Sequence, residues 1–154
     1  MAIYIVLMLA VCVLDQLTKQ WAVVVLMEKG SIPVIDGALH FTYLENRGAA
    51  FGILADQRWI FMLASCAAIV LLLVYSFMIQ GKRPLLRTSL ALIVGGGIGN
   101  MFDRCLLGYV VDFIDVRLFR FWKWVFNIAD CAVCIGGALL IVAALWEMKR
   151  ERTK

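Results

Sequence analysis

The stretch IFMLASCAAIVLLLVYSFMI, residues 60–79, contains no charged side chain, and Trp59 stands directly before it. A helix rises about 1.5 Å per residue, so about 20 apolar residues cross the roughly 30 Å hydrocarbon core of a bilayer. Tryptophan is enriched where such helices leave the hydrocarbon for the headgroups. We therefore predict that residues 60–79 form a transmembrane helix, which makes the chain an integral membrane protein.

The composition of the whole chain agrees with a membrane location. Of its 154 residues, 64% are hydrophobic and 17% are charged, and the mean hydropathy is +0.91. Soluble domains are about half apolar and a quarter charged. A chain of this length favours one domain. We predict an all-α membrane protein with a single domain over residues 1–154 and four transmembrane helices, at residues 2–25, 60–79, 87–107 and 128–146.

The placement of lysine and arginine predicts the orientation of these helices. Two short segments, a linker without acids and the C-terminal tail, hold a dense group of basic residues: Lys82, Arg83, Arg87, Lys149, Arg150, Arg152 and Lys154. The other side holds equally many, spread over two longer loops. Density therefore favours a cytoplasmic location for both termini. We interpret the net charge of +4 as a topology signal and expect no nucleic-acid partner.

The two long loops carry different patterns. Residues 31–43 alternate loosely and are bounded by Gly30, Pro33 and Gly37, which favours short strands at the membrane surface. Residues 109–126 mix aromatic rings with basic side chains, a composition typical of the headgroup zone.

Polar residues from five segments are expected to lie at one depth, on the outer side. Helix rise places Asp15 in the outer half of the first span and Asn100 toward the outer end of the third. Asp130 lies at the outer edge of the fourth, and the outer loops contribute Asn46 and Asp112. Ionisable groups inside a membrane are costly and are usually functional. We therefore predict a functional site at the extracytoplasmic face.

The side-chain inventory narrows the chemistry at such a site. His40 is the only histidine, which argues against histidine triads and multi-histidine zinc sites. No serine is expected beside Lys19, and no cysteine has a basic partner. Cys131 and Cys134 form a CxxC without a second pair, which favours helix packing over a metal site. Carboxylates remain, and we expect neither a metal nor a cofactor.

Two carboxylates held close together share one proton, so that one activates water while the other donates to the scissile carbonyl. Asp130 follows Asn127, which resembles an N-cap, and the helix dipole favours an ionised Asp130. Asp112 is then the proton carrier, although Asp115 in the same loop competes for that role. Without chemistry, Asp130 would be an ordinary acid at a helix start, and Asp112 a solvated loop acid.

Other polar groups have structural interpretations. Asp103 beside Arg104 fits a local ion pair, and Asp15 with Lys19 fits charge neutralisation at i,i+4 spacing. The run GGGIGN, residues 95–100, contains glycines at GxxxG spacing, which favours close helix packing. A transporter or proton relay, or an assembly factor that binds through the glycine face, are rival functions.

Five motifs, in order along the chain, resemble the lipoprotein signal peptidase family, also called signal peptidase II. They are DQLTK at residues 15–19, NRGAAFG at 46–52, GGGIGNMFDR at 95–104, VVDFID at 110–115 and FNIAD at 126–130. The resemblance implies a membrane aspartyl endopeptidase of the bacterial plasma membrane. Such an enzyme removes the signal peptide from prolipoproteins, just before a cysteine that carries diacylglycerol. The family fold has a small extracytoplasmic β-cradle and a surface helix above four transmembrane helices.

The resemblance also implies roles for single residues. The catalytic dyad falls on Asp112 and Asp130, which demotes Asp115. The residues that it implies line or orient the site are Asn46, Asn100, Arg104, Asn127 and Asp15. Its implied partners are diacylglyceryl-modified prolipoproteins and membrane lipids, with globomycin as an inhibitor.

Overall fold

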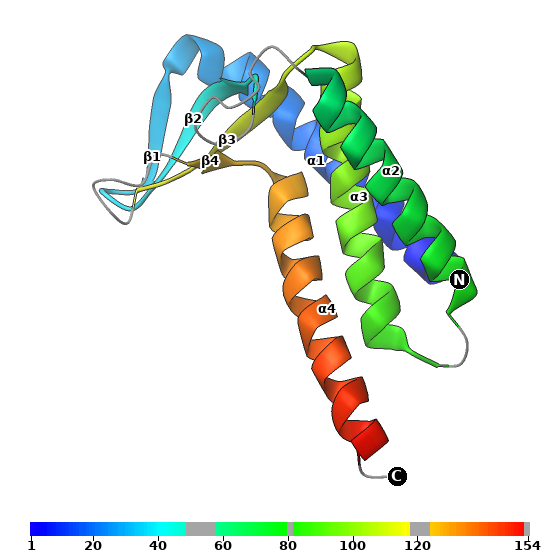
Figure 1. Ribbon diagram of the computed structural model, residues 1–154. Helices are drawn as coiled ribbons and strands as arrows, with labels where there is room; N and C mark the ends of the chain where they lie inside the picture. The colour runs from blue at the N-terminus through cyan, green and yellow to red at the C-terminus, as the bar shows by residue number, and fades with distance from the viewer. Residues whose placement is uncertain (49–57, 80–81, 118–123, 153–154) are drawn as a thin grey trace.

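The computed structural model describes residues 1–48, 58–79, 82–117 and 124–152. Four helices make up most of these residues: α1 Ala2–Lys29, α2 Arg58–Met78, α3 Pro84–Leu106 and α4 Ile128–Arg152. Helix α3 packs against each of the other three (Figure 1). The helix starts and ends follow local chemistry, since Pro84 occupies the first position of α3 and Gly30 ends α1 with a positive φ of 74°.

Three of these helices, α1, α3 and α4, are long and apolar enough to cross a membrane. The apolar part of α2 within the described residues, Met62–Met78, is shorter. Of the four predicted spans, residues 2–25, 87–107 and 128–146 therefore correspond to membrane-length helices. The protein is thus a mostly helical membrane protein, to which a small sheet is added.

Glycines of α3 let its neighbours approach closely. A Cβ on Gly95 would lie 2.8 Å from the carbonyl oxygen of Met8 in α1, and one on Gly96 would lie 2.4 Å from the carbonyl oxygen of Ala129 in α4. Both distances are shorter than carbon and oxygen tolerate. The interpretation of the glycine run as a helix-packing surface is therefore confirmed, and it holds for two faces of α3 at once.

A four-stranded antiparallel sheet has the order β1-β2-β3-β4, in which β1 and β2 follow α1 and β3 and β4 follow α3. Its strands are β1 Ser31–Ile35, β2 Leu39–Asn46, β3 Val110–Val116 and β4 Val125–Phe126. The strands expected in residues 31–43 are confirmed, whereas the second loop also supplies two strands that its aromatic composition did not indicate. Within the described residues, α1–α4 are the only helices, so the surface helix that the resemblance implies is not among them. Part of the NRGAAFG motif, residues 49–52, lies outside the described residues.

Aromatic packing fixes the sheet against the second half of α1. The ring of Trp21 lies 5.3 Å from that of Phe41 and 6.1 Å from that of Phe113, edge to face in both cases. Ala22 and Leu26 of α1 are fully buried in the same cluster. Figure 1 shows the sheet at one end of the helices, with the start of α1 and the end of α4 toward the other. Strand β3 therefore lies beside both α1 and α3.

Candidate active site

The first turn of α4 is capped by reciprocal hydrogen bonds. The backbone N–H of Asp130 donates to Asn127 Oδ1 at 2.9 Å, and the backbone N–H of Asn127 donates to Asp130 Oδ2 at 3.2 Å. This arrangement is a capping box with an aspartate in the third helical position. The predicted N-cap is therefore confirmed, and the cap holds the Asp130 carboxylate at the helix start.

Asp112 on β3 is only 1% exposed and accepts two amide hydrogen bonds. Asn46 of β2 donates from Nδ2 to Asp112 Oδ2 at 2.9 Å, and Asn127 donates from Nδ2 to Asp112 Oδ1 at 2.6 Å. Asn127 thus donates to both carboxylates, to that of Asp112 from its side chain and to that of Asp130 from its backbone. The structure brings together two carboxylates that are 18 residues apart in the chain.

Asn100 and Arg104 reach the same place from α3. Asn100 donates from Nδ2 to Asp130 Oδ1 at 2.8 Å, and its Oδ1 accepts from Asn127 Nδ2 at 3.1 Å. The guanidinium of Arg104 donates to the carbonyl oxygen of Asn100 at 3.4 Å. Its positive charge acts on both Asp130 and Asp112. These two residues therefore add a donor and a cation beside the carboxylates.

A buried cluster of charged side chains lies next to Asn100 and the start of α4. Lys19 of α1 pairs with Asp15 at 2.7 Å and with Asp103 of α3 at 3.0 Å, and each of the three side chains is at most 3% exposed. The predicted pairing of Asp15 with Lys19 is confirmed, and Asp103 pairs with Lys19 rather than with its neighbour Arg104. Asp15 Oδ1 also accepts from the N–H of Ala129 at 2.8 Å. Asp15 therefore caps α4 from another helix.

The environment of Asp112 changes its acidity. Burial raises the pKa of the Asp112 carboxyl to about 7, although the hydrogen bond from Asn46 opposes this shift. The nearby charge of Asp130 raises the pKa further. A carboxyl with such a pKa is protonated in a large fraction of molecules near neutral pH. It can donate a proton at the pH where most enzymes work.

Asp115, the competing loop acid, has different neighbours. Its Oδ2 accepts from Thr42 at 3.0 Å and from Arg117 Nε at 2.7 Å. Side chains alternate between the two faces of a strand, so residues 112 and 115 of β3 point to opposite faces. The structure therefore places the largely buried Asp115 in an ion pair with the exposed Arg117, on the face of β3 opposite to Asp112.

Asp115→Asn is expected to keep the cleavage activity that the family resemblance implies within about fivefold of the unchanged protein, because a partly exposed ion pair contributes at most about 1 kcal/mol. The measurement is the initial rate of signal-peptide release by the purified variant. A loss as large as that of Asp112→Asn would contradict the choice of Asp112 over Asp115 as the catalytic acid.

The supporting network extends beyond the residues that the sequence indicated. Gln16 Nε2 donates to Asp103 Oδ1 at 2.8 Å, and Asp103 Oδ2 accepts from the N–H of Val111 at 3.1 Å. The sequence contained one indication of these contacts: Gln16 and Lys19 belong to the DQLTK motif and lie at the same depth in the membrane as Asp15. Within the described ranges, no three His, Cys, Asp or Glu side chains are grouped as metal ligands would be.

Comparisons with known proteins agree with this geometry. The sequence model of the family described as Signal peptidase (SPase) II matches residues 7–146. A lipoprotein signal peptidase of Halothermothrix orenii is 42% identical over 148 residues, which cover 96% of this chain and 97% of the relative. One from Syntrophomonas wolfei is 39% identical and covers 93% of each.

Solved structures are similar over the same length. One bacterial membrane enzyme has a TM-score of 0.86 and 31% identity, and the match covers 100% of this chain and 94% of that one. A second has a TM-score of 0.84 and 34% identity, with 94% of each chain covered. The resemblance drawn from the five motifs is confirmed: the chain belongs to the signal peptidase II family, whose members are hydrolases of the aspartic type.

Proposed function

We propose that this protein removes the signal peptide from bacterial prolipoproteins, cutting just before the diacylglyceryl-modified cysteine, with Asp112 and Asp130 as its catalytic dyad. The family supports the reaction class. The observation that carries the dyad is the position of Asn127, which hydrogen-bonds Asp112 at 2.6 Å and, through its backbone, Asp130 at 3.2 Å. Two carboxylates linked in this way can hold one proton and one water between them.

The reaction follows from the different environments of the two acids. Asp130 removes a proton from the water, the water oxygen attacks the scissile carbonyl carbon, and Asp112 gives its proton to the carbonyl oxygen. The resulting gem-diol returns a proton to Asp112 as the C–N bond breaks, while Asp130 passes its proton to the leaving nitrogen. Both acids end in their starting states, and a carboxylic acid and an amine are released.

The surrounding residues have supporting roles in this proposal. Asn46 holds Asp112 by the 2.9 Å hydrogen bond to Oδ2, and Asn100 holds Asp130 by the 2.8 Å bond to Oδ1. Arg104 supplies positive charge while negative charge builds up on the oxygens between the acids. Asp15 keeps α4, and with it Asp130, in place through the 2.8 Å bond to Ala129.

For the membrane arrangement, we infer four spans in one domain, with α2 as the fourth. Its 21 residues reach about 31 Å as a helix, which matches the hydrocarbon thickness. The basic segments around Arg83 and Arg150 support cytoplasmic termini. The dyad then lies at the extracytoplasmic face of the bacterial plasma membrane, where lipids surround the helices and the lipid-modified substrate arrives.

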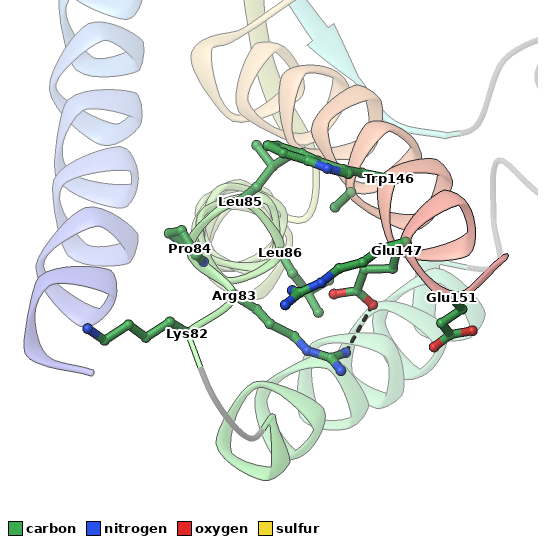
Figure 2. Close-up of a pocket in the computed structure, with 10 residues that line it drawn as sticks. Lys82, Arg83, Pro84, Leu85, Leu86, Trp146, Glu147 and Glu151 are labelled. Atoms are coloured by element: carbon green, nitrogen blue, oxygen red, sulfur yellow. Dashed lines mark hydrogen bonds and ion pairs between the residues drawn. The ribbon is translucent and has the colours of Figure 1, made fainter. Parts of the chain in front are cut away.

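A transporter is the main rival function. The region between the dyad and the other end of the helices argues against it. At that other end, a cavity of about 330 Å³ lies between the start of α3 and the end of α4, and Figure 2 shows Arg83 and Glu147 paired across it. Their 2.9 Å pair is well exposed. The core between this cavity and the dyad contains apolar clusters: Ile79, Leu86, Leu90, Ala143, Met8, Ala91 and Val94. Among the described residues, the buried members of these clusters are all apolar, which argues against a path for an ion between the two ends.

The substrate proposal is tested with one prolipoprotein in two forms, with and without the diacylglyceryl group. The purified protein is expected to cleave the lipid-modified form before its cysteine and to leave the unmodified form intact. Globomycin is expected to inhibit the cleavage. Mass spectrometry of both products locates the cut. Equal cleavage of the unmodified form would contradict the proposed specificity.

The pKa of Asp112 predicts how the rate depends on pH. Because the pKa is raised to about 7, the proton that Asp112 must donate is present below pH 7 and is lost above it. Catalysis is expected to fall by about tenfold per pH unit on the alkaline side. The same shift makes stability decrease as pH rises toward 7, because the unfolded chain releases this proton at lower pH. Initial rates in detergent across this range provide the measurement, and a rate that stays level to about pH 9 would contradict the assignment.

A further inference from the structure

Lys19 is a buried cation whose contacts extend beyond charge neutralisation. Its side chain is 3% exposed, and its ammonium has three partners. Two are carboxylates, Asp15 at 2.7 Å and Asp103 at 3.0 Å, and the third is the side-chain oxygen of Asn100 at 2.9 Å. An ammonium has three hydrogens to donate. Each hydrogen of Lys19 therefore has its own acceptor.

The contact with Asn100 determines which way that amide faces. A lysine ammonium only donates hydrogen bonds, so the group that Asn100 turns toward Lys19 must be its oxygen. The same oxygen accepts from Asn127 at 3.1 Å. The amide NH₂ must then face the other way, where it donates to Asp130 Oδ1 at 2.8 Å. A reversed amide would place its NH₂ against an ammonium and leave Asp130 without this donor.

We propose that Lys19 is a positioning residue of the reaction: it locks the amide of Asn100 so that the NH₂ group holds Asp130 as a hydrogen-bond acceptor. Asp130 must accept a proton from water, and a fixed donor on Oδ1 orients the carboxylate for that step. Lys19 does not touch the reacting atoms, because one residue separates it from Asp130. The inference rests on the proposed dyad and adds to it a fixed direction for one of its hydrogen bonds.

A purely structural role for Lys19 makes a different prediction, and the chain allows the two to be separated. Lys19→Met leaves Asp15 and Asp103 buried without their cation, which lowers stability whatever else Lys19 does. The double variant Lys19→Met/Asp103→Asn restores the charge balance, since one acid and one base are removed together. Asparagine at position 103 keeps an acceptor for the N–H of Val111. Its amide oxygen replaces the carboxylate oxygen in that bond.

The experiment measures kcat, KM and the thermal unfolding temperature of the purified full chain on a diacylglyceryl-modified peptide. Asp103→Asn alone is the matched control. For the double variant we expect an unfolding temperature closer to the unchanged protein than that of Lys19→Met. Its kcat is expected to stay about tenfold or more below that of Asp103→Asn, with KM unchanged. A double variant with the kcat of Asp103→Asn would overturn the proposal and leave Lys19 as a structural ion-pair member.

A mutant cycle with Asn100 provides the second readout. If Lys19 acts through that amide, adding Lys19→Met to Asn100→Ala/Asp103→Asn lowers kcat no further, whereas losses that multiply would overturn the proposal. The dyad itself is judged by other variants. Activity in Asp130→Asn would refute the proposed function, and an inactive Asp130→Asn beside a fully active Lys19→Met/Asp103→Asn would refute only the role of Lys19.

Discussion

Asp112→Asn and Asp130→Asn are each expected to lower signal-peptide cleavage by at least about a thousandfold, because each removes one of the two proton-transfer groups. An amide neither carries the proton that Asp112 donates nor accepts the one that Asp130 removes. The loss is expected in kcat, since both side chains act on the reacting atoms. Single-turnover rates on a lipid-modified peptide measure it.

Folding must be measured on the same preparations. Both carboxylates accept two hydrogen bonds, so an asparagine at either position turns its NH₂ group, a donor, toward an existing donor. We expect a loss of about 1 to 3 kcal/mol of stability, which leaves a folded protein. Asp115→Asn is the matched control, because it replaces an acid on the same strand. Cleavage within about tenfold of normal by either dyad variant would refute the mechanism.

Gly96→Ala is expected to produce the second-largest effect. Its new Cβ would lie 2.4 Å from the carbonyl oxygen of Ala129 and 3.2 Å from the carbonyl carbon. Because these atoms belong to the backbone, no side chain can turn away, and α4 must move from α3. Overpacking of this kind costs about 1 to 3 kcal/mol. The displaced first turn of α4 carries Asp130, so we also expect a loss of activity of about a hundredfold.

Gly137→Ala on α4 separates this clash from the general effect of adding a methyl group. A Cβ on Gly137 would meet nothing within 4 Å. Alanine favours a helix over glycine by about 1 kcal/mol, so this control is expected to be as active as the unchanged protein and slightly more stable. Thermal unfolding and cleavage rates of both variants provide the comparison. Similar behaviour of the two would show that contact between α3 and α4 does not hold the site together.

Local patterns predicted one half of the site well. Asn127 and Asp130 are three residues apart and satisfy the N–H groups of their own helix, so the cap could be inferred from the sequence alone. The helix-packing role of the glycine run likewise depends on spacing within one helix. Both are short-range effects, in which sequence separation and spatial separation are nearly the same.

The other half depends on contacts between distant segments. Asn46 and Asp112 meet because β2 pairs with β3. Strand β3 was not predicted, because VVDFID is a short apolar run that clear turn signals do not bound on both sides. Once the strand is known, alternation separates Asp112 from Asp115, a choice that otherwise depended on the family motif. The pairing of Lys19 with Asp103 is similar, because periodicity within either helix says nothing about which residue faces it.

The bond from Asp15 to the N–H of Ala129 has a consequence for biosynthesis. Asp15 lies in α1 and Ala129 in α4, 114 residues later, so α1 is synthesised well before α4. Until α4 docks against α1, Asp15 lacks this N–H partner and the first turn of α4 is not held in place. With the proposed dyad, a chain whose α4 has not yet docked therefore cannot cleave a signal peptide.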